Sequence, residues 1–275
     1  MQVRELWSQD DQVCLAGFEI ALRNGDLAGV LLAVEGVPPA YAAEVRNQLH
    51  VLGARIRDEA SLTDPPTAMV RVLVDQEDLR GDRDDYFNPR NSHLSAVLSR
   101  RRGLPILLSA VWMLVGEQAG VPVDGIGLPG HFVVRVGGPG GVLVDPFGGG
   151  NMLSTADCAQ LVSTMATGEV AWNDAWLSAT SYDTLVERVL RNLMNAFQHS
   201  GEPENLFRIA RFYSALRPHE AEPQLVHARL AEVMGARDRA LTLYRGIQDH
   251  FPGTQAADLA GMRLVELRDE PQEFN

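Results

Sequence analysis

The feature that most restricts the fold is a nearly continuous apolar stretch, LPILLSAVWMLVGEQAG, at residues 104–120. A helix that is apolar on all sides must be buried, and this stretch is shorter than the roughly 20 residues that span a membrane. Pro105 suits the first turn of a helix, and Gly120 suits the position after its last turn. The sequence therefore predicts a buried central helix around which the rest of a domain packs.

The segments before and after this helix differ in kind. Residues 11–81 are predicted to be helical, and within 40–60 the apolar side chains recur at the spacing of one helix face. After the apolar helix, HFVVRV and GVLVDPF are typical of strands, and GGPGG between them is typical of a hairpin loop. Helices first and strands afterwards favour an α+β fold over alternating strands and helices.

The last third of the chain contains a repeat. Gly201 and Gly235 are 34 residues apart, and so are Pro218 and Pro252. Each glycine separates two helical segments, and each proline ends the second of them. This period is typical of the tetratricopeptide repeat; the alternative is an unrelated pair of helical hairpins. Two repeats and a final helix at about 254–268 predict an all-α segment that presents a groove to a protein or peptide partner.

Charge and cysteine content exclude several classes of function. The formal net charge of -12 disfavours nucleic-acid binding, and the absence of lysine excludes Schiff-base chemistry. Cys14 and Cys158 are far apart, so neither a disulfide framework nor a zinc cluster is expected. The N-terminus lacks the basic and apolar regions of a signal peptide. We therefore expect a cytoplasmic protein that binds neither nucleic acid nor membrane.

The segment GIGLPGH at residues 125–131 has the G-x-G-x-x-G spacing of dinucleotide-binding loops. Such a loop needs a helix after it, so that the helix N-terminus faces the pyrophosphate. Here a strand-like segment follows, and Pro129 lacks a backbone donor. We therefore interpret the glycines as a tight turn into a strand, with Gly130 leaving space beside His131.

The two predicted strands bring His131 close to an aspartate. If the loop at 137–141 closes a regular hairpin, Val136 pairs with Val142, and Asp145 then lies opposite Val133. Asp145 would share a face with His131, one diagonal of roughly 7–8 Å away. A carboxylate in that position can hold an imidazole and fix its tautomer. The alternative is a structural histidine and an aspartate that caps the following Pro-Phe turn.

The run from YFNPRNS to HFVVRV, with LVDPFGGGNMLS after it, resembles the SirB-type transglutaminase-like family, whose members often carry C-terminal tetratricopeptide repeats. The most specific matches are N-P-x-N-S, R-x-G-x-P-I, P-G-H-F and D-P-F-x-G-G. The resemblance implies a papain/transglutaminase-like domain at 1–178, helical over 1–81 with its core at 82–178, and repeats at 179–275. It also implies a catalytic pair, because His131 and Asp145 match the histidine and aspartate of active members.

The nucleophile that this resemblance implies is missing. Active members carry a cysteine at the start of the central helix, and Pro105 occupies that position here. Ser109 lies one turn further along as a possible substitute; the alternative is a small residue that packs inside the helix and bonds the carbonyl four residues earlier. Cys14 is expected on or beside an apolar helix face, and Cys158 follows Asp157, whose charge opposes thiolate formation. Neither cysteine is therefore expected to act as the nucleophile.

Several residues are expected to line the site or to be candidates for metal binding. The family pattern places Asn88, Asn91 and Ser92 near it, beside Pro105 and Gly130; the alternative is a loop whose side chains bond its own turns. Metal binding at His131, Asp145 and His93 has no supporting ligand spacing, so no metal or cofactor is expected.

Three hypotheses for the function follow. The first is a transglutaminase-like pseudoenzyme that has lost its nucleophile and binds a peptide or protein in a regulatory or scaffold role. The second is an amide hydrolase or acyl transferase that uses His131 and Asp145 with Ser109 or an activated water. The third is an adaptor whose function resides in the repeat helices.

Overall fold

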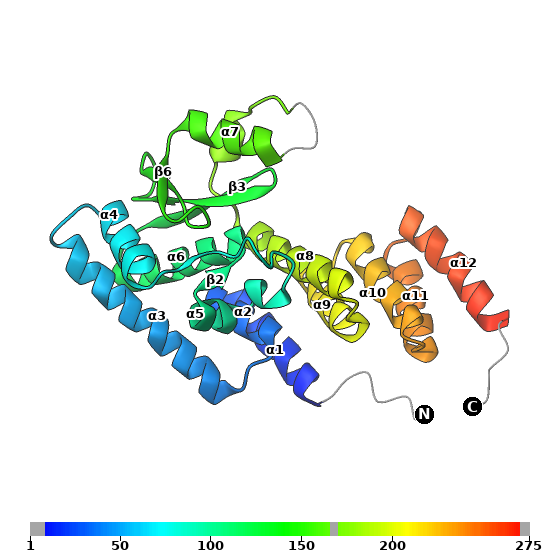
Figure 1. The fold of residues 1–275 in the computed structure, drawn as a ribbon. Helices are drawn as coiled ribbons and strands as arrows, with labels where there is room; N and C mark the ends of the chain where they lie inside the picture. The colour runs from blue at the N-terminus through cyan, green and yellow to red at the C-terminus, as the bar shows by residue number, and fades with distance from the viewer. Residues whose placement is uncertain (1–8, 166–169, 270–275) are drawn as a thin grey trace. The chain divides into compact units, whose positions relative to one another are not determined.

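The computed structural model describes residues 9–165 and 170–269. It divides into two compact units, which we describe separately (Figure 1). The larger unit comprises Ala21–Val189, and the smaller unit joins the described parts of Met1–Ile20 and Leu190–Asn275. Among the described residues, no helix has the length and apolar character needed to cross a bilayer.

The smaller unit takes in the beginning of helix α1 (Gln9–Asn24), which the predicted division at residue 178 assigns to the other domain. The rings of Phe18 and Phe212 meet edge to face, with centroids 5.0 Å apart. Nearby, Arg208 Nε lies 3.3 Å from Asp11 Oδ1. These contacts join residues far apart in the sequence, so the helical spacing of residues 11–24 does not indicate them.

The larger unit is mainly helical around a small sheet. Its helices are α2 (Leu27–Glu35), α3 (Pro39–Ala60), α4 (Pro65–Val70), the π-helix η1 (Arg71–Gln76), the 3-10 helix η2 (Pro89–Ser92), α5 (Leu94–Arg100), α6 (Pro105–Ala119), α7 (Thr155–Met165), the 3-10 helix η3 (Asp174–Leu177) and the beginning of α8 (Tyr182–Ser200).

Helix α6 is the buried central helix that the apolar stretch predicts. Leu107, Leu108 and Trp112 are completely buried in it, and Gly120 ends it in the left-handed conformation. Helix α3 packs along α6, and so do two strands of the sheet (Figure 1). The surface of α6 is therefore covered on several sides, as a helix that is apolar all round requires.

Four strands form an antiparallel sheet in the order β3-β4-β5-β6. They are β3 (Val123–Leu128), β4 (His131–Val136), β5 (Val142–Asp145) and β6 (Asn151–Leu153). A separate parallel pair joins β1 (Arg80–Gly81) to β2 (Arg102–Gly103), directly before α6. A helix-rich unit with an antiparallel sheet matches the expected α+β core.

The smaller unit consists of helical hairpins. After α8 come α9 (Pro203–Leu216), α10 (Ala221–Val233), α11 (Arg237–His250) and α12 (Gln255–Asp269). Helix α11 begins and ends 34 residues after α9, and α12 begins 34 residues after α10. Gly201 and Gly235 both have positive φ, at 69° and 71°. The predicted helical period is therefore confirmed, with each glycine in the turn between two helices.

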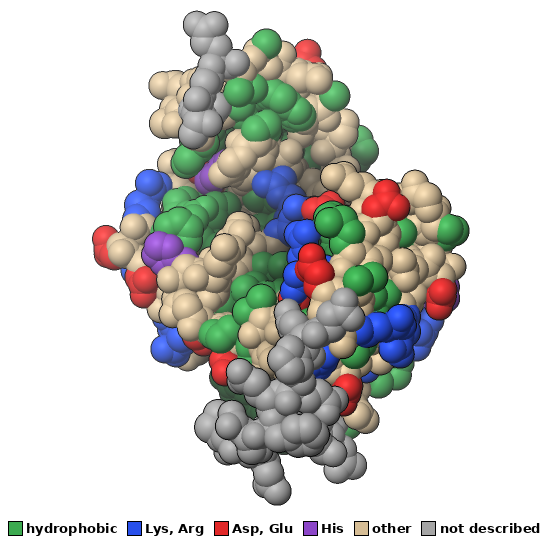
Figure 2. Space-filling model, turned by 90° about the vertical axis from the view of Figure 1, so that its right-hand side faces the viewer, with side chains coloured by type: hydrophobic (Ala, Val, Ile, Leu, Met, Phe, Trp, Pro, Cys, Tyr) green, Lys and Arg blue, Asp and Glu red, His purple; other side chains and the backbone are tan. Residues whose placement is uncertain are grey.

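Figure 2 shows one face of the molecule, with side chains coloured by type. Its hydrophobic side chains, in green, lie in several separate groups among polar and backbone atoms. Small separate apolar groups are usual on protein surfaces, so this face does not by itself indicate an interface.

A buried histidine lies in the core of the smaller unit. His227 on α10 is 3% exposed, and its ring centroid is 5.3 Å from that of Phe207. Burial, together with the charges of Arg239 and Arg211, lowers the pKa of His227 from 6.5 to about 3. The folded protein therefore holds this imidazole in the neutral form.

The stability of the folded protein should consequently fall as the pH decreases below 6.5. In the unfolded chain His227 is protonated below this pH, whereas in the folded chain it stays neutral down to about pH 3. Between about pH 7.5 and pH 5 this linkage lowers the free energy of unfolding by about 2 kcal/mol. We expect His227→Leu to lose this dependence in urea unfolding, whereas His250→Leu, at an exposed site, retains it. The same pH dependence in both variants would contradict the assignment.

Candidate active site

The register between β4 and β5 determines which side chains meet. Val136 pairs with Val142, and Val134 pairs with Val144, as the hairpin prediction requires. Because alternate residues share a face, this register places Asp145 on the same face as His131. The expected proximity is confirmed: His131 Nε2 lies 3.0 Å from Asp145 Oδ1.

The pair is almost completely removed from solvent. His131 is 2% exposed and Asp145 is 5% exposed. A carboxylate only accepts hydrogen bonds, so Nε2 of His131 carries the hydrogen that the pair shares. The other ring nitrogen, Nδ1, is buried and has no hydrogen-bond partner among the described residues. That nitrogen is the one through which His131 can accept a proton from a nucleophile.

Glycines after β5 leave room for the aspartate. A Cβ atom on Gly148 would lie 2.5 Å from Asp145 Oδ2, and the backbone N–H of Gly150 donates to the carbonyl of Asp145 at 2.8 Å. Phe147, in the same turn, places its ring edge-on to the ring of His131, with centroids 5.9 Å apart. The D-P-F-G-G-G turn thus surrounds the pair from one side.

Each glycine of GIGLPGH has a separate role in packing or in the turn. A Cβ atom on Gly125 would lie 2.8 Å from the ring of Phe132. One on Gly127 would lie 2.5 Å from Nη1 of Arg188. Gly130 has a φ of 72°, in the two-residue turn that joins β3 to β4. The motif therefore permits close packing around the first residues of β4.

Arg188 is a residue of this site that the sequence analysis did not identify. Its Nη2 donates to the carbonyls of Leu128 and His131, at 3.1 and 2.9 Å, and its guanidinium lies 5.0 Å from the ring centroid of Phe132. Burial lowers the pKa of Arg188. Arg188 thereby fixes both ends of the turn that precedes His131, from a helix 57 residues further along the chain.

The candidate nucleophiles lie in unfavourable surroundings. Pro105 is the first residue of α6 and has no reactive atom. Ser109 is completely buried, and its hydroxyl donates to the carbonyl of Phe132 at 3.4 Å rather than to His131. Burial, assisted by Asp157 and Asp145, raises the pKa of the Cys158 thiol to about 11. Cys158 is therefore a neutral thiol at physiological pH.

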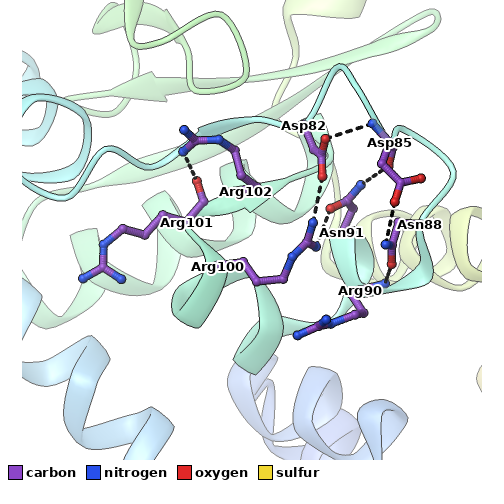
Figure 3. A network of polar contacts seen from close by, with 8 residues as sticks. All are labelled: Asp82, Asp85, Asn88, Arg90, Asn91, Arg100, Arg101 and Arg102. Carbon is purple, nitrogen blue, oxygen red and sulfur yellow. Dashed lines mark hydrogen bonds and ion pairs between the residues drawn. The ribbon is translucent and has the colours of Figure 1, made fainter.

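The polar residues before α6 bond to one another (Figure 3). The amide of Asn91 donates to the carbonyl of Asp85 at 2.7 Å and accepts from Arg100 at 2.8 Å. Arg100 also pairs with Asp82 at 2.9 Å. Asn88 accepts from the backbone N–H of Arg90 at 3.0 Å. These side chains therefore brace the loop at 82–91.

The braced loop in turn holds the start of α6. The backbone N–H of Leu104, the residue before the helix, donates to the carbonyl of Asn91 at 3.0 Å. Ser92, the remaining polar residue of the motif, is buried, and its hydroxyl has no partner in the described part of the chain. Asn88 and Asn91 consequently have contacts that fit the structural alternative. A role of these three residues in lining a site remains a prediction.

The packing around Gly127 predicts the effect of an added methyl group. Gly127→Ala should lower the free energy of unfolding by about 1–3 kcal/mol, because the methyl would force Arg188 and Thr180 away from the hairpin. Gly246→Ala is the matched control, since its Cβ would meet open space on α11 and should raise stability by about 0.5–1 kcal/mol. Urea unfolding of the two variants measures both effects. A neutral Gly127→Ala would contradict the proposed packing.

Comparison with known proteins agrees with this arrangement. The transglutaminase-like superfamily model matches residues 42–191. A UPF0162 protein of Xylella fastidiosa is 31% identical over 238 residues, covering 84% of this chain and 83% of that protein. A UPF0162 protein of Pseudomonas aeruginosa is 30% identical over 252 residues, covering 90% and 85%.

A further match involves part of a larger protein. F-box only protein 21 of Homo sapiens is 30% identical over 176 residues, which are 59% of this chain and 27% of that protein. No solved structure matches the chain. The superfamily model covers more than half of the chain and includes both members of the histidine–aspartate pair, so the chain belongs to the transglutaminase-like superfamily.

Proposed function

We propose that this protein is a SirB-type transglutaminase-like pseudoenzyme that binds a peptide or protein and does not catalyse thiol-dependent acyl transfer. The observation that carries this proposal is Pro105 at the start of α6, the position at which the family resemblance places the thiol nucleophile. A cysteine at a helix N-terminus beside an imidazole is activated as a thiolate. Proline provides neither a nucleophile nor a proton to transfer.

The other nucleophiles do not compensate for this loss. Nδ1 of His131 has no partner among the described residues, so no described hydroxyl is bonded to it. The hydroxyl of Ser109 is bonded to a backbone carbonyl instead. The thiol of Cys158 stays protonated at neutral pH. These contacts favour binding over catalysis in the transglutaminase-like unit.

The alternative function is an amide hydrolase or acyl transferase that uses an activated water or Ser109. One observation favours it: the His131–Asp145 hydrogen bond of 3.0 Å is complete and buried. An oriented imidazole with one free nitrogen has what a general base requires. A water molecule bound between the substrate and Nδ1 of His131 could then act as the nucleophile, with the imidazole as its general base.

We assign the partner-binding surface to the helices after Leu190, as tetratricopeptide repeats. The period and the positive φ at Gly201 and Gly235 support this assignment. A hollow of about 260 Å³ lies on these helices. It is lined by Pro218, Gln224, Thr242, Leu243, Gly246, Ile247, His250 and Phe251. Its mixed apolar and polar lining fits a short peptide segment.

Two free cysteines suit a reducing compartment, and we place the protein in the cytoplasm.

The proposal predicts that the protein has no acyl-transfer or amide-hydrolysis activity that depends on His131. Purified protein should release no ammonia from glutamine peptides and attach no fluorescent amine to casein above the level of buffer. His131→Gln should give the same result, and His50→Gln, at an exposed histidine outside the proposed binding surfaces, serves as the matched control.

A different result would identify the alternative. Turnover that falls by about a hundredfold or more in His131→Gln, and not in His50→Gln, would overturn the pseudoenzyme proposal. Loss of that turnover in Ser109→Ala would assign the nucleophile to Ser109, and its retention would assign it to water.

A further inference from the structure

The two edges of the four-stranded sheet differ in whether another segment pairs with them. The outer edge of β3 is covered, because Ile126 forms a bridge with Ala179 and the N–H of Thr180 donates to the carbonyl of Gly125 at 2.8 Å. The sheet ends at β6 on the other side. Within the described residues, no strand or bridge pairs with the outer edge of β6.

Strand β6 lacks the features that prevent an edge from pairing with another chain. Edge strands are commonly protected by charged side chains, proline or bulges. Strand β6 reads Asn151, Met152 and Leu153, with no charge and no proline, and pairs regularly with β5. Met152 exposes half of its surface, at 50%. This edge is therefore open to pairing, and its short length limits it to a small partner.

A groove follows this edge. It has a volume of about 460 Å³ and lies between β6 and one face of α7. Its lining residues are Asn151, Met152, Leu153, Asp157, Gln160, Leu161 and Thr164. The only charged residue among these seven is Asp157. Hydrogen bonds from Ser154 lower the pKa of that carboxyl, which keeps it ionised at neutral pH. The groove thus combines the apolar side chains of Met152, Leu153 and Leu161 with uncharged polar side chains and one negative charge.

We propose that the outer edge of β6 binds an extended peptide as a fifth strand, with an apolar side chain against Met152 and a basic side chain near Asp157. Strand addition uses backbone hydrogen bonds for affinity and alternate side chains for specificity. A basic peptide complements Asp157 and the net charge of -12. The inference rests on the proposed peptide-binding function and gives it a second location. Because Asn151 pairs with Asp145, the added strand would lie one strand away from the residue that holds His131.

The test uses the full chain and two blocked heptapeptides, one alternating valine with arginine and the other alternating valine with glutamate. The arginine peptide should bind about tenfold more tightly in fluorescence anisotropy, and it should slow amide hydrogen exchange at residues 151–153. Met152→Lys should weaken that binding about tenfold, and Asp157→Asn, which keeps an acceptor for the Ser154 contact, should weaken it about threefold. Val142→Lys is the matched control on β5, because Val142 is 39% exposed and does not line the groove.

Several results would overturn the inference. Equal affinity for the two peptides, no exchange protection at 151–153, or equal weakening by Met152→Lys and Val142→Lys would each do so. Self-association that Met152→Lys abolishes, without peptide binding, would assign the edge to a second copy of the chain. Protection confined to residues 242–251 would reject the β6 site and keep the peptide-binding function. Enzymatic turnover that depends on His131 would reject the pseudoenzyme proposal, whereas peptide binding at β6 would still be decided by hydrogen exchange at residues 151–153.

Discussion

Pairing of β4 with β5 in a single register brings His131 and Asp145 together, and a slip of one residue would place their side chains on opposite faces of the sheet. Other features of the larger unit hold the strand that begins with His131. Arg188 donates to the carbonyls at the two ends of the β3–β4 turn, those of Leu128 and His131, and Gly127 leaves the space that its guanidinium occupies. The sheet itself packs on α6, whose first turn is tied to the braced loop at 82–91.

In the function proposed here, the histidine–aspartate pair is present and only the nucleophile at the start of α6 is lacking. An oriented imidazole needs no particular residue at the start of α6, so the histidine–aspartate pair can form whether or not a thiol lies there. Acyl transfer does need that thiol or a substitute, because the imidazole only accepts and returns a proton. The pseudoenzyme proposal therefore depends on one position, Pro105, and requires no other change in the fold.

Sequence analysis succeeded where the determinants are local. The apolar run specified α6, the Gly-Gly-Pro-Gly-Gly loop specified the β4–β5 register, and the 34-residue period specified the helical hairpins. Arg188 was missed because its partners are backbone carbonyls about 60 residues away, which leave no pattern in the sequence. The grouping of the beginning of α1 with α9 was missed for the same reason, since it depends on the contact between Phe18 and Phe212.

The most direct measurement is the thiol pKa of Pro105→Cys, obtained from the pH dependence of iodoacetamide alkylation with mass spectrometry to distinguish it from Cys14 and Cys158. If His131 and Asp145 form a transglutaminase-type pair facing this position, the new thiol should have a pKa well below the usual value of about 8.5. His131→Gln in the same background should then raise that pKa. A thiol pKa at or above its usual value, unchanged by His131→Gln, would contradict the account.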